Sequence, residues 1–391
     1  MMHFIRSFLP HHMRRQVKEL FIFTSLIDFA LALVTIFEPI YLYKIGYGLS
    51  EIMFFYFVVY ILYFVIVPVG AKFAHRFGYE LGMFVGSGFF IAFYLSLFFI
   101  DKYPILFFIT PIIFAIQKMF YWPAYHANFA RFSDKEEQGK QISVVNVATS
   151  AIFIIGPVLA GFIISQWGYG ALFIVASIIF LSSNIPTLLT KESFKPSSFS
   201  YRRAYQDLFS KENRQSFLGY VGFGEELIAV IIWPVFISIV IVNVFDLGLV
   251  VTLATFITTL VVFYIGKLTD SKNKRKILSL GAYIYALAWF FRIFIINTAG
   301  VFFVDTLSRL GKNIISVPLI ALTYEKAKEQ EANKERVIMS RVLFFEMALI
   351  VGKLLAIIII FILTYFIADE ALAFKITFIL GGAMTLLYML L

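Results

Sequence analysis

Long runs of apolar residues alternate with short polar links along the chain. Each run is long enough for a helix that crosses a bilayer, which needs roughly 20 mainly apolar residues. The pattern predicts an all-α integral membrane protein with twelve transmembrane helices. They are expected at about 20–43, 51–70, 81–100, 104–126, 141–166 and 169–190, and then at about 216–242, 246–266, 277–297, 299–324, 338–366 and 372–391.

The first six runs and the last six share a register of small residues and prolines. A fixed offset of this kind indicates an internal duplication. It predicts six-helix bundles at 1–190 and 216–391, joined by a cytoplasmic linker at 191–215 that is either an amphipathic surface helix or a solvated segment. An offset of 195 residues relates Ala71 to Gly266, Pro39 to Pro234, Gly86 to Gly281 and Pro123 to Pro318.

The composition excludes several classes of protein. Hydrophobic residues make up 61% of the chain and charged residues 15%, which is far from the balance of a soluble domain. Cysteine is absent, so no disulfide or thiolate metal site is expected. The first run contains Asp28 and Glu38 and is not followed by a small-residue cleavage site, so it is interpreted as a retained span. We find no Gly-rich phosphate loop ending in Lys-Ser/Thr, and we expect no cofactor and no metal.

The charges in the links predict the orientation. Alternate links, beginning with the N-terminus, carry most of the 33 Lys and Arg residues, whereas the opposite set carries only Lys44 and Lys102. By the positive-inside rule both termini are cytoplasmic, and the protein is expected in the plasma (inner) membrane. The net charge of +9 is therefore explained by contact with lipid headgroups, and no nucleic acid is expected.

Two basic turns, AKFAHRFGYE at 71–80 and GKLTDSKNKR at 266–275, lie at equivalent places in the two halves. They resemble the loop signature Gly-x-Leu-Ala-Asp-Arg-x-Gly-Arg-Arg of the major facilitator superfamily (MFS), although His75 stands where the signature has Asp. The resemblance extends over essentially the whole chain and is closest to prokaryotic twelve-helix members. It implies the MFS fold and secondary transport. These turns either gate the conformational change or carry charges that only set the membrane topology. The residues concerned are Arg76, Gly78, Gly266, Asp270 and Arg275.

The fifth run contains IIGPVLAGFI at 154–163. It is similar to the Gly-Pro-x-x-x-Gly region of superfamily exporters, which favours export; small-residue packing without directional meaning is the alternative. We expect Pro157 to bend this helix while Gly156 and Gly161 permit close contact. The fourth-helix Arg motif of proton-coupled members is absent, because Lys118 does not have its spacing from Pro123.

Charged residues within the spans are the main candidates for function. A charge at mid-bilayer costs roughly 2.5–3.5 kcal/mol, so most of them are expected to face water or one another. Glu38 and Glu225, near span ends, could instead reach the interface. The resemblance implies that helices one, four, seven and ten line the transport path. The alternative is that these charged residues pair with one another between helices and have only a structural role. The substrate and proton pathway is predicted to include Asp28, Lys118, Glu225, Glu226, Arg292, Asp305, Arg309, Lys312 and Glu346.

On the tenth helix, Asp305, Arg309 and Lys312 share one face because they are spaced i, i+4 and i+7. Asp305 and Arg309 can pair within the helix, which leaves Lys312 for another partner or a ligand. Glu346 and Lys353 are similarly spaced by seven.

Aromatic residues beside these charges could stack on a substrate or lie at the lipid interface. The candidates are Trp122, Tyr125 and Trp233, with Tyr121 beside them. His75 and His126 could titrate, but an ordinary interface position explains them equally.

The sequence therefore predicts alternating access between two halves, with Asp28 or Glu226 exchanging a proton. The favoured function is proton-coupled export of a drug or metabolite. Proton- or cation-coupled uptake of a sugar, peptide or other nutrient is the alternative, and a membrane enzyme or an assembly subunit is more remote. The expected partners are a small-molecule substrate, a coupling ion and the lipid bilayer, with the protein as a monomer.

Overall fold

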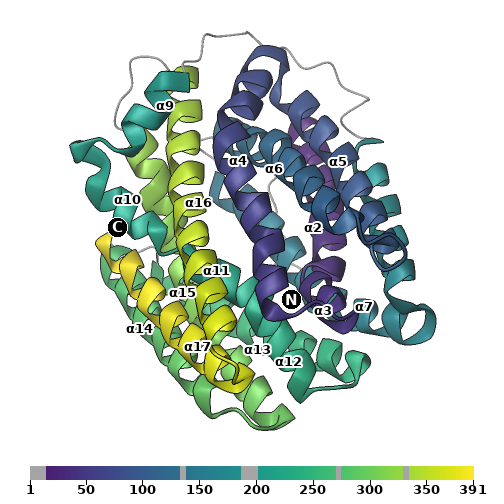
Figure 1. Cartoon of the computed structure of the whole chain (residues 1–391). Helices are drawn as coiled ribbons and strands as arrows, with labels where there is room; N and C mark the ends of the chain where they lie inside the picture. The colour runs from purple at the N-terminus through teal and green to yellow at the C-terminus, as the bar shows by residue number, and fades with distance from the viewer. Residues whose placement is uncertain (1–14, 133–137, 186–200, 270–273, 329–333) are drawn as a thin grey trace, which may run out of the picture.

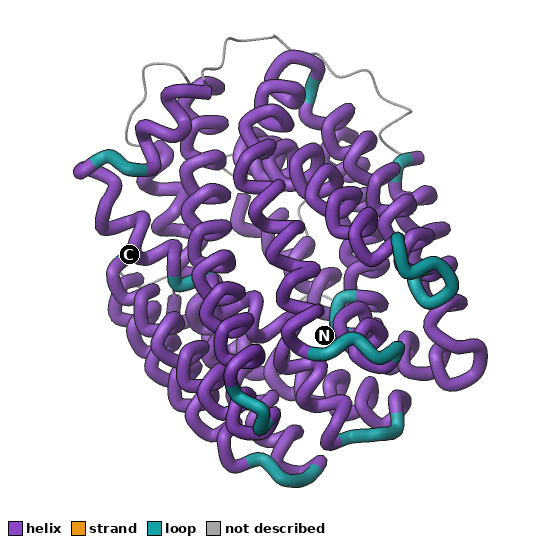
Figure 2. The backbone as a smooth tube through the Cα atoms, viewed as in Figure 1, coloured by secondary structure: helices purple, strands orange, loops and turns teal. Residues whose placement is uncertain are grey.

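The computed structural model describes residues 15–132, 138–185, 201–269, 274–328 and 334–391, and these residues contain helices and no strand (Figures 1 and 2). The first half consists of α2 (Arg15–Val34), α3 (Phe37–Lys44), α4 (Leu49–Phe77), α5 (Tyr79–Phe99), α6 (Leu106–Phe132) and α7 (Gln138–Ser183). The central segment contains α9 (Tyr201–Leu208) and η1 (Lys211–Asn213). The second half consists of α10 (Arg214–Val221), α11 (Gly224–Leu227), η2 (Ile228–Ile232), α12 (Trp233–Val240), α13 (Val244–Thr269), α14 (Lys274–Phe291), η3 (Arg292–Phe294), α15 (Thr298–Lys328), α16 (Lys334–Phe366), α17 (Glu370–Leu386) and η4 (Leu387–Leu390).

These helices account for the twelve expected spans. Within the described residues, nine segments are long and apolar enough to cross a membrane, and Val244–Leu260 is a shorter apolar helix. One of the nine, in α7, contains two spans because the backbone turns at Gly168, where φ is 81°. The remaining span is α15, which carries Asp305, Arg309 and Lys312. The all-α, twelve-helix prediction is confirmed.

The helices of each half pack mainly on one another. In the first half, α6 packs against α4 and α5, and α2 packs against α7. In the second half, α15 packs against α13 and α14, and α11 packs against α16. The main contacts between the halves are those of α7 with α13, of α4 and α6 with α16, and of α3 with α12 and η2. The link at 241–243 ends just before α13, and Gly161 of α7 lies against Val244 and Phe245 there. The halves are thus in contact at the end of the molecule that carries this link, the lower end in Figure 2.

Prolines within spans expose carbonyl groups that other helices approach. Pro123 has no N–H, so the carbonyl of Met119 lacks its usual helical donor. Gly70 of α4 lies directly against this carbonyl: a Cβ at Gly70 would be 1.9 Å from the Met119 oxygen. A weak Cα–H···O contact suits this geometry. Gly70 is therefore required for the close approach of α4 to α6.

Matching glycines make similar contacts in the two halves. A Cβ at Gly86 of α5 would lie 2.8 Å from the Cβ of Tyr121 on α6. At Gly281 of α14, 195 positions later, it would lie 2.9 Å from Ile314 and from Ile315 on α15. The duplicated register thus coincides with a duplicated helix contact, while the domain boundaries at 190 and 216 stay a prediction.

The helix of the central segment, α9, packs against α4 and α16. Pro68 frees the carbonyl of Phe64 in α4. The Tyr205 hydroxyl donates to the carbonyl oxygens of Phe64 at 3.3 Å and of Val65 at 3.2 Å. The end of the segment before the second half is therefore anchored on both halves.

Replacing Gly70 by alanine tests the contact between α4 and α6. We expect G70A to lower stability by about 2 kcal/mol or more, because the added methyl group meets backbone that cannot move aside. G88A is the matched control, since nothing lies within 4 Å of a Cβ there. Thermal unfolding of the purified protein in detergent measures both. Equal stability of G70A and G88A would contradict this account of the contact.

Candidate transport site

Span seven is interrupted where it carries its two glutamates. A turn at Gly222 and Phe223 separates α10 from α11, and the π-helix η2 follows directly. Such local π segments often occur at functional sites. Backbone contact with α16 is tight here, because a Cβ at Gly224 would lie 2.5 Å from the Gly352 oxygen. The interruption directs Glu225 and Glu226 to different neighbours.

Glu225 is fully buried and has three donors. It accepts hydrogen bonds from the hydroxyls of Tyr285 at 2.7 Å and Tyr388 at 2.8 Å, and it pairs with Lys312 of α15. The alternative that Glu225 reaches the interface is wrong, because these donors satisfy it inside the second half. Lys312 likewise has a protein partner.

Glu226 lies beside residues of the other half. It pairs with Lys353 of α16 at 2.9 Å, and its side chain is 39% exposed. The Lys353 ammonium lies 5.4 Å from the ring centre of Tyr60 in α4, and Lys118 of α6 lies at the same distance from that ring. The Lys118 ammonium also lies 4.3 Å from the ring centre of Phe114. We call Tyr60, Lys118, Glu226 and Lys353 the central charge cluster.

Among the described residues, Lys118 is the cation of this cluster that forms no salt bridge. Its contacts in the described part of the chain are the two rings and the longer-range fields of Glu38 and Glu226. Cation–π contacts of this kind contribute roughly 0.5–2 kcal/mol, less than a buried ammonium loses on leaving water. Lys118 is partly exposed and can bind an added anionic group.

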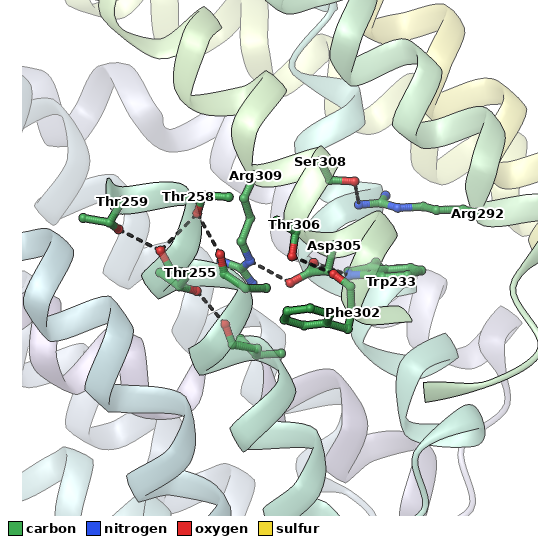
Figure 3. A network of polar contacts seen from close by, with 12 residues as sticks. Trp233, Thr255, Thr258, Thr259, Arg292, Phe302, Asp305, Thr306, Ser308 and Arg309 are labelled. Carbon is green, nitrogen blue, oxygen red and sulfur yellow. Dashed lines mark hydrogen bonds and ion pairs between the residues drawn. The ribbon is translucent and has the colours of Figure 1, made fainter. Parts of the chain in front are cut away.

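A second polar network lies in the second half (Figure 3). Asp305 accepts hydrogen bonds from Arg309 Nε at 2.7 Å and from Trp233 Nε1 at 3.0 Å. The predicted pair within α15 is thus present in the structure. Trp233 is buried, and its indole N–H holds Asp305.

Arg292 completes this network. Its guanidinium lies 3.6 Å from the ring centre of Trp289 and 4.2 Å from that of Trp233. One nitrogen donates to the Ser308 hydroxyl at 3.1 Å, while Nε and Nη1 have no hydrogen-bond partner among the described residues. The field of Asp305 partly compensates this buried charge.

Two carboxylates within the spans of the first half accept hydrogen bonds from hydroxyl groups. Asp28 of α2 accepts from Thr149 of α7 at 2.8 Å, and Glu38 of α3 accepts from Tyr56 of α4 at 2.5 Å. The alternative that Glu38 reaches the interface is also wrong, because its side chain is buried and hydrogen-bonded. No cation forms a salt bridge with either carboxylate within the described residues. The structure does not bring Asp28 into contact with the central charge cluster.

Glu346 of α16 joins the halves in the interior. Its carboxylate accepts from the Tyr63 hydroxyl of α4 at 2.8 Å and lies 3.1 Å from His126 Nε2 of α6. Trp122 stacks on His126 with ring centres 5.7 Å apart, and Tyr125 lies edge-on to Trp122 at 5.8 Å. Trp122 and Tyr125 therefore flank an imidazole–carboxylate contact.

The gating turns are described in part. Gly78 separates α4 from α5 with φ of 110°, a conformation that favours glycine. Arg76 is exposed, with its guanidinium 5.2 Å from the Phe77 ring centre, and Arg275 is exposed in the first turn of α14. Gly266 belongs to α13, and Asp270 lies outside the described residues. Gating by these residues stays a prediction.

The helix-five motif lies in close contacts. Gly156 packs against Ala32 of α2, and the Pro157 carbonyl lies against Gly248 of α13. The backbone of α7 leaves helical geometry at Gly168 and not at Pro157, so a bend at Pro157 stays a prediction.

Sequence reasoning missed the hydroxyl donors of the site and gave His126 no specific partner. Every buried carboxylate described above except Asp305 accepts from a Tyr or Thr hydroxyl. The chain has 21 tyrosines, and only helix packing distinguishes those that face an acid. The donors missed are Tyr56, Tyr63, Thr149, Tyr285 and Tyr388.

Breaking the pair of Glu225 and Lys312 tests the second-half network. We expect E225Q to lower stability by about 2 kcal/mol, less than for a fully buried pair, because Lys312 is 30% exposed. The double variant E225Q/K312M removes the uncompensated charge and should recover most of this loss. Thermal unfolding of both proteins makes the comparison; a double variant no more stable than E225Q would refute the charge-pair account.

Comparison with known proteins places this geometry in context. The model of the Major Facilitator Superfamily matches residues 20–334. The uncharacterised protein YqgE of Bacillus subtilis (strain 168) is 21% identical over 246 residues, a match that covers 61% of this chain and 56% of YqgE. The match thus spans little more than half of that relative.

Solved structures share the fold at low sequence identity. A POT family transporter in complex with 5-aminolevulinic acid superposes with a TM-score of 0.69 at 13% identity, covering 98% of this chain and 97% of that one. A POT family transporter in complex with a thioalcohol-conjugated peptide gives a TM-score of 0.70, with the same identity and coverage.

Proposed function

Because the chain belongs to the Major Facilitator Superfamily, we propose that it is a proton-coupled transporter that binds its solute at the central charge cluster. Membership of the family makes the protein a multi-pass membrane transporter of small molecules and not an enzyme. The coupling ion, the direction and the binding residues belong to the proposal.

The proposed binding site rests on the positions of Lys118 and Glu226. They come from opposite halves, both are partly exposed, and the same ring, that of Tyr60, faces Lys118 and the Lys353 partner of Glu226. A solute held between the halves senses their relative movement, as alternating access requires. Lys118 would bind an anionic group of the solute. Glu226 would bind a cationic group of the solute, which would replace Lys353 as its partner.

Asp28 is the carboxylate we propose for the coupled proton. Its partner is a neutral hydroxyl, so protonation leaves no buried cation uncompensated, unlike protonation of Glu226 beside Lys353. One proton moving down a 100 mV potential supplies roughly 2.3 kcal/mol. A tenfold solute gradient costs about 1.4 kcal/mol, so a single proton is sufficient.

Export of a drug or metabolite is the direction we favour, on the resemblance of the helix-five motif to exporters. Proton-coupled uptake of a zwitterionic nutrient, such as a peptide, is the second candidate, because the central charge cluster offers one positive and one negative group in one place. The pathway proposed for either direction comprises Asp28, Lys118, Trp122, Tyr125, Glu225, Glu226, Trp233, Arg292, Asp305, Arg309, Lys312 and Glu346.

A thermal-shift screen with metabolites and drugs, followed by flux measurements in proteoliposomes, tests the function. For a stabilising compound, we expect flux driven by an imposed pH gradient, and the gradient sign that drives accumulation gives the direction. D28N should reduce gradient-driven flux at least tenfold while solute exchange without a gradient continues. D246N, at an exposed position, is the control. Normal coupling in D28N would exclude Asp28 as the proton site.

Labelling of introduced cysteines tests the proposed orientation, since the chain has no cysteine of its own. Tyr103 lies in the link between α5 and α6, and Phe209 follows α9; they are 50% and 72% exposed. In intact cells, a membrane-impermeant maleimide should label Y103C and not F209C, because both termini and the central segment are expected in the cytoplasm. Permeabilised cells should show labelling of both. The reverse pattern would invert the topology.

A further inference from the structure

Arg292 carries a buried positive charge that the ion pairs of the second half leave over. Three other interior cations of this half each pair with one carboxylate; the pairs are Arg309–Asp305, Lys312–Glu225 and Lys353–Glu226. Arg292 is 2% exposed and forms no ion pair within the described residues. A charged group that has left water without a paired opposite charge is costly. A negative group beside this guanidinium would therefore be strongly stabilising.

Three buried N–H groups at the same place have no acceptor. Arg292 Nε and Nη1 and Trp289 Nε1 make no hydrogen bond to any described residue. They belong to two side chains in contact, since the guanidinium carbon lies 3.6 Å from the ring centre of Trp289. The third guanidinium nitrogen donates to the Ser308 hydroxyl at 3.1 Å (Figure 3). The neighbourhood of the excess charge is thus rich in donors and poor in acceptors.

The nearest carboxylates do not serve these donors. Asp305 accepts from Trp233 Nε1 through one oxygen and from Arg309 Nε through the other, and Glu225 already has three donors. Both acids act on Arg292 through their fields only. The negative end of the α14 dipole also favours a cation here, because α14 ends at the preceding residue. It supplies no acceptor to Nε or Nη1.

The surrounding helices enclose the three donors. Trp289 is fully buried, and the guanidinium carbon of Arg292 lies 4.2 Å from the ring centre of Trp233 on α12. On the other side, a Cβ at Gly381 of α17 would lie 2.8 Å from the Trp289 ring. A group that binds these donors must therefore be small. This requirement favours a free inorganic ion over the carboxylate of a larger solute.

We propose that Arg292 and Trp289 bind a small monovalent inorganic anion, such as chloride, where α12, α14, α15 and α17 meet. The anion accepts from the guanidinium and from the indole N–H, and it compensates the charge that the ion pairs leave over. A water molecule would leave that charge in place and would bring two hydrogens that need acceptors of their own. The site is distinct from the central charge cluster and goes beyond the proposed function, in which Arg292 is one residue of the pathway.

The anion would come from the outer solution. Arg292 follows the end of α14 that is opposite the basic turn, so the predicted orientation places it toward the outer face. Ile296, four residues later in the link to α15, is 88% exposed. The path from the solution to the site is therefore short, and we expect the bound anion to exchange with anions of the medium.

Thermal unfolding in detergent, with no solute and no ion gradient, tests the site. The protein is purified in sodium gluconate, whose anion is too large to be enclosed, and sodium chloride then replaces it at constant ionic strength. We expect chloride to raise the Tm of the parent by about 2 °C or more in a saturable manner, because a ligand of the folded state stabilises it. K375Q, which removes an exposed cation of α17, should respond as the parent does.

Two variants locate the effect at the proposed site. R292M removes the excess charge together with its donors and should lose the chloride response. W289F keeps an aromatic ring and removes one N–H, so the chloride concentration for half of the effect should rise about tenfold, as expected for the loss of a hydrogen bond to an ion.

Bromide quenching of tryptophan fluorescence provides a second measurement. Trp167 is 67% exposed and would be quenched by collision alone, so W167F is the background for this experiment. We expect a saturable loss of fluorescence with bromide in W167F, because the ion binds beside Trp289 and near Trp233. The saturable part should disappear in W167F/R292M.

The outcomes decide the proposal and leave the proposed transport function aside. An equal Tm in chloride and in gluconate overturns it and means that the donors bind water only. A chloride response that is unchanged in both R292M and W289F also overturns it, because the ion then acts elsewhere. If R292M does not fold, the midpoint of W289F and the bromide quenching of W167F give the answer. Proton coupling and solute binding are measured by flux and are not affected by either result.

Discussion

An ionised side chain in the hydrocarbon layer needs a partner, and this requirement determines where the helices of this protein meet. Each such charge costs roughly 2.5–3.5 kcal/mol if it is left to the lipid. Glu225 draws together α11, α14, α15 and the C-terminal η4. Glu346 draws α4 and α6 to α16. The charged residues are therefore also the points at which the packing is specified, since apolar surfaces between spans have little orientational preference in lipid.

The backbone supplies a second kind of contact that the charges depend on. Proline frees a carbonyl in α4 and another in α6, and Tyr205 and Gly70 respectively occupy the positions in front of them. Gly224 and Gly352 bring the interrupted span seven against α16 at main-chain distance. Glu226 reaches Lys353 only because these two backbones approach so closely. Small residues and charged residues thus act together.

The spans and their number could be predicted from sequence because the length of an apolar run is a local property. The pair of Asp305 and Arg309 could be predicted for the same reason, since a spacing of four places both on one helix face. Glu225 and Lys312 are 87 residues apart, and their pairing depends on how three helices pack. The alternative of an interface position for Glu38 and Glu225 was wrong, because the tyrosines that donate to them come from other helices.

The two halves differ in how they hold negative charge, and this difference bears on the proposed mechanism. In the second half Glu225, Glu226 and Asp305 each face a cation, so protonating one of them would leave a buried positive charge without compensation. In the first half Asp28 and Glu38 face hydroxyl groups, which tolerate either state of the acid. Glu346 lies between these cases, because it accepts from the Tyr63 hydroxyl and also faces the His126 imidazole. In the proposed mechanism a proton is therefore exchanged at Asp28 in the first half, while the paired charges of the second half remain available to the solute.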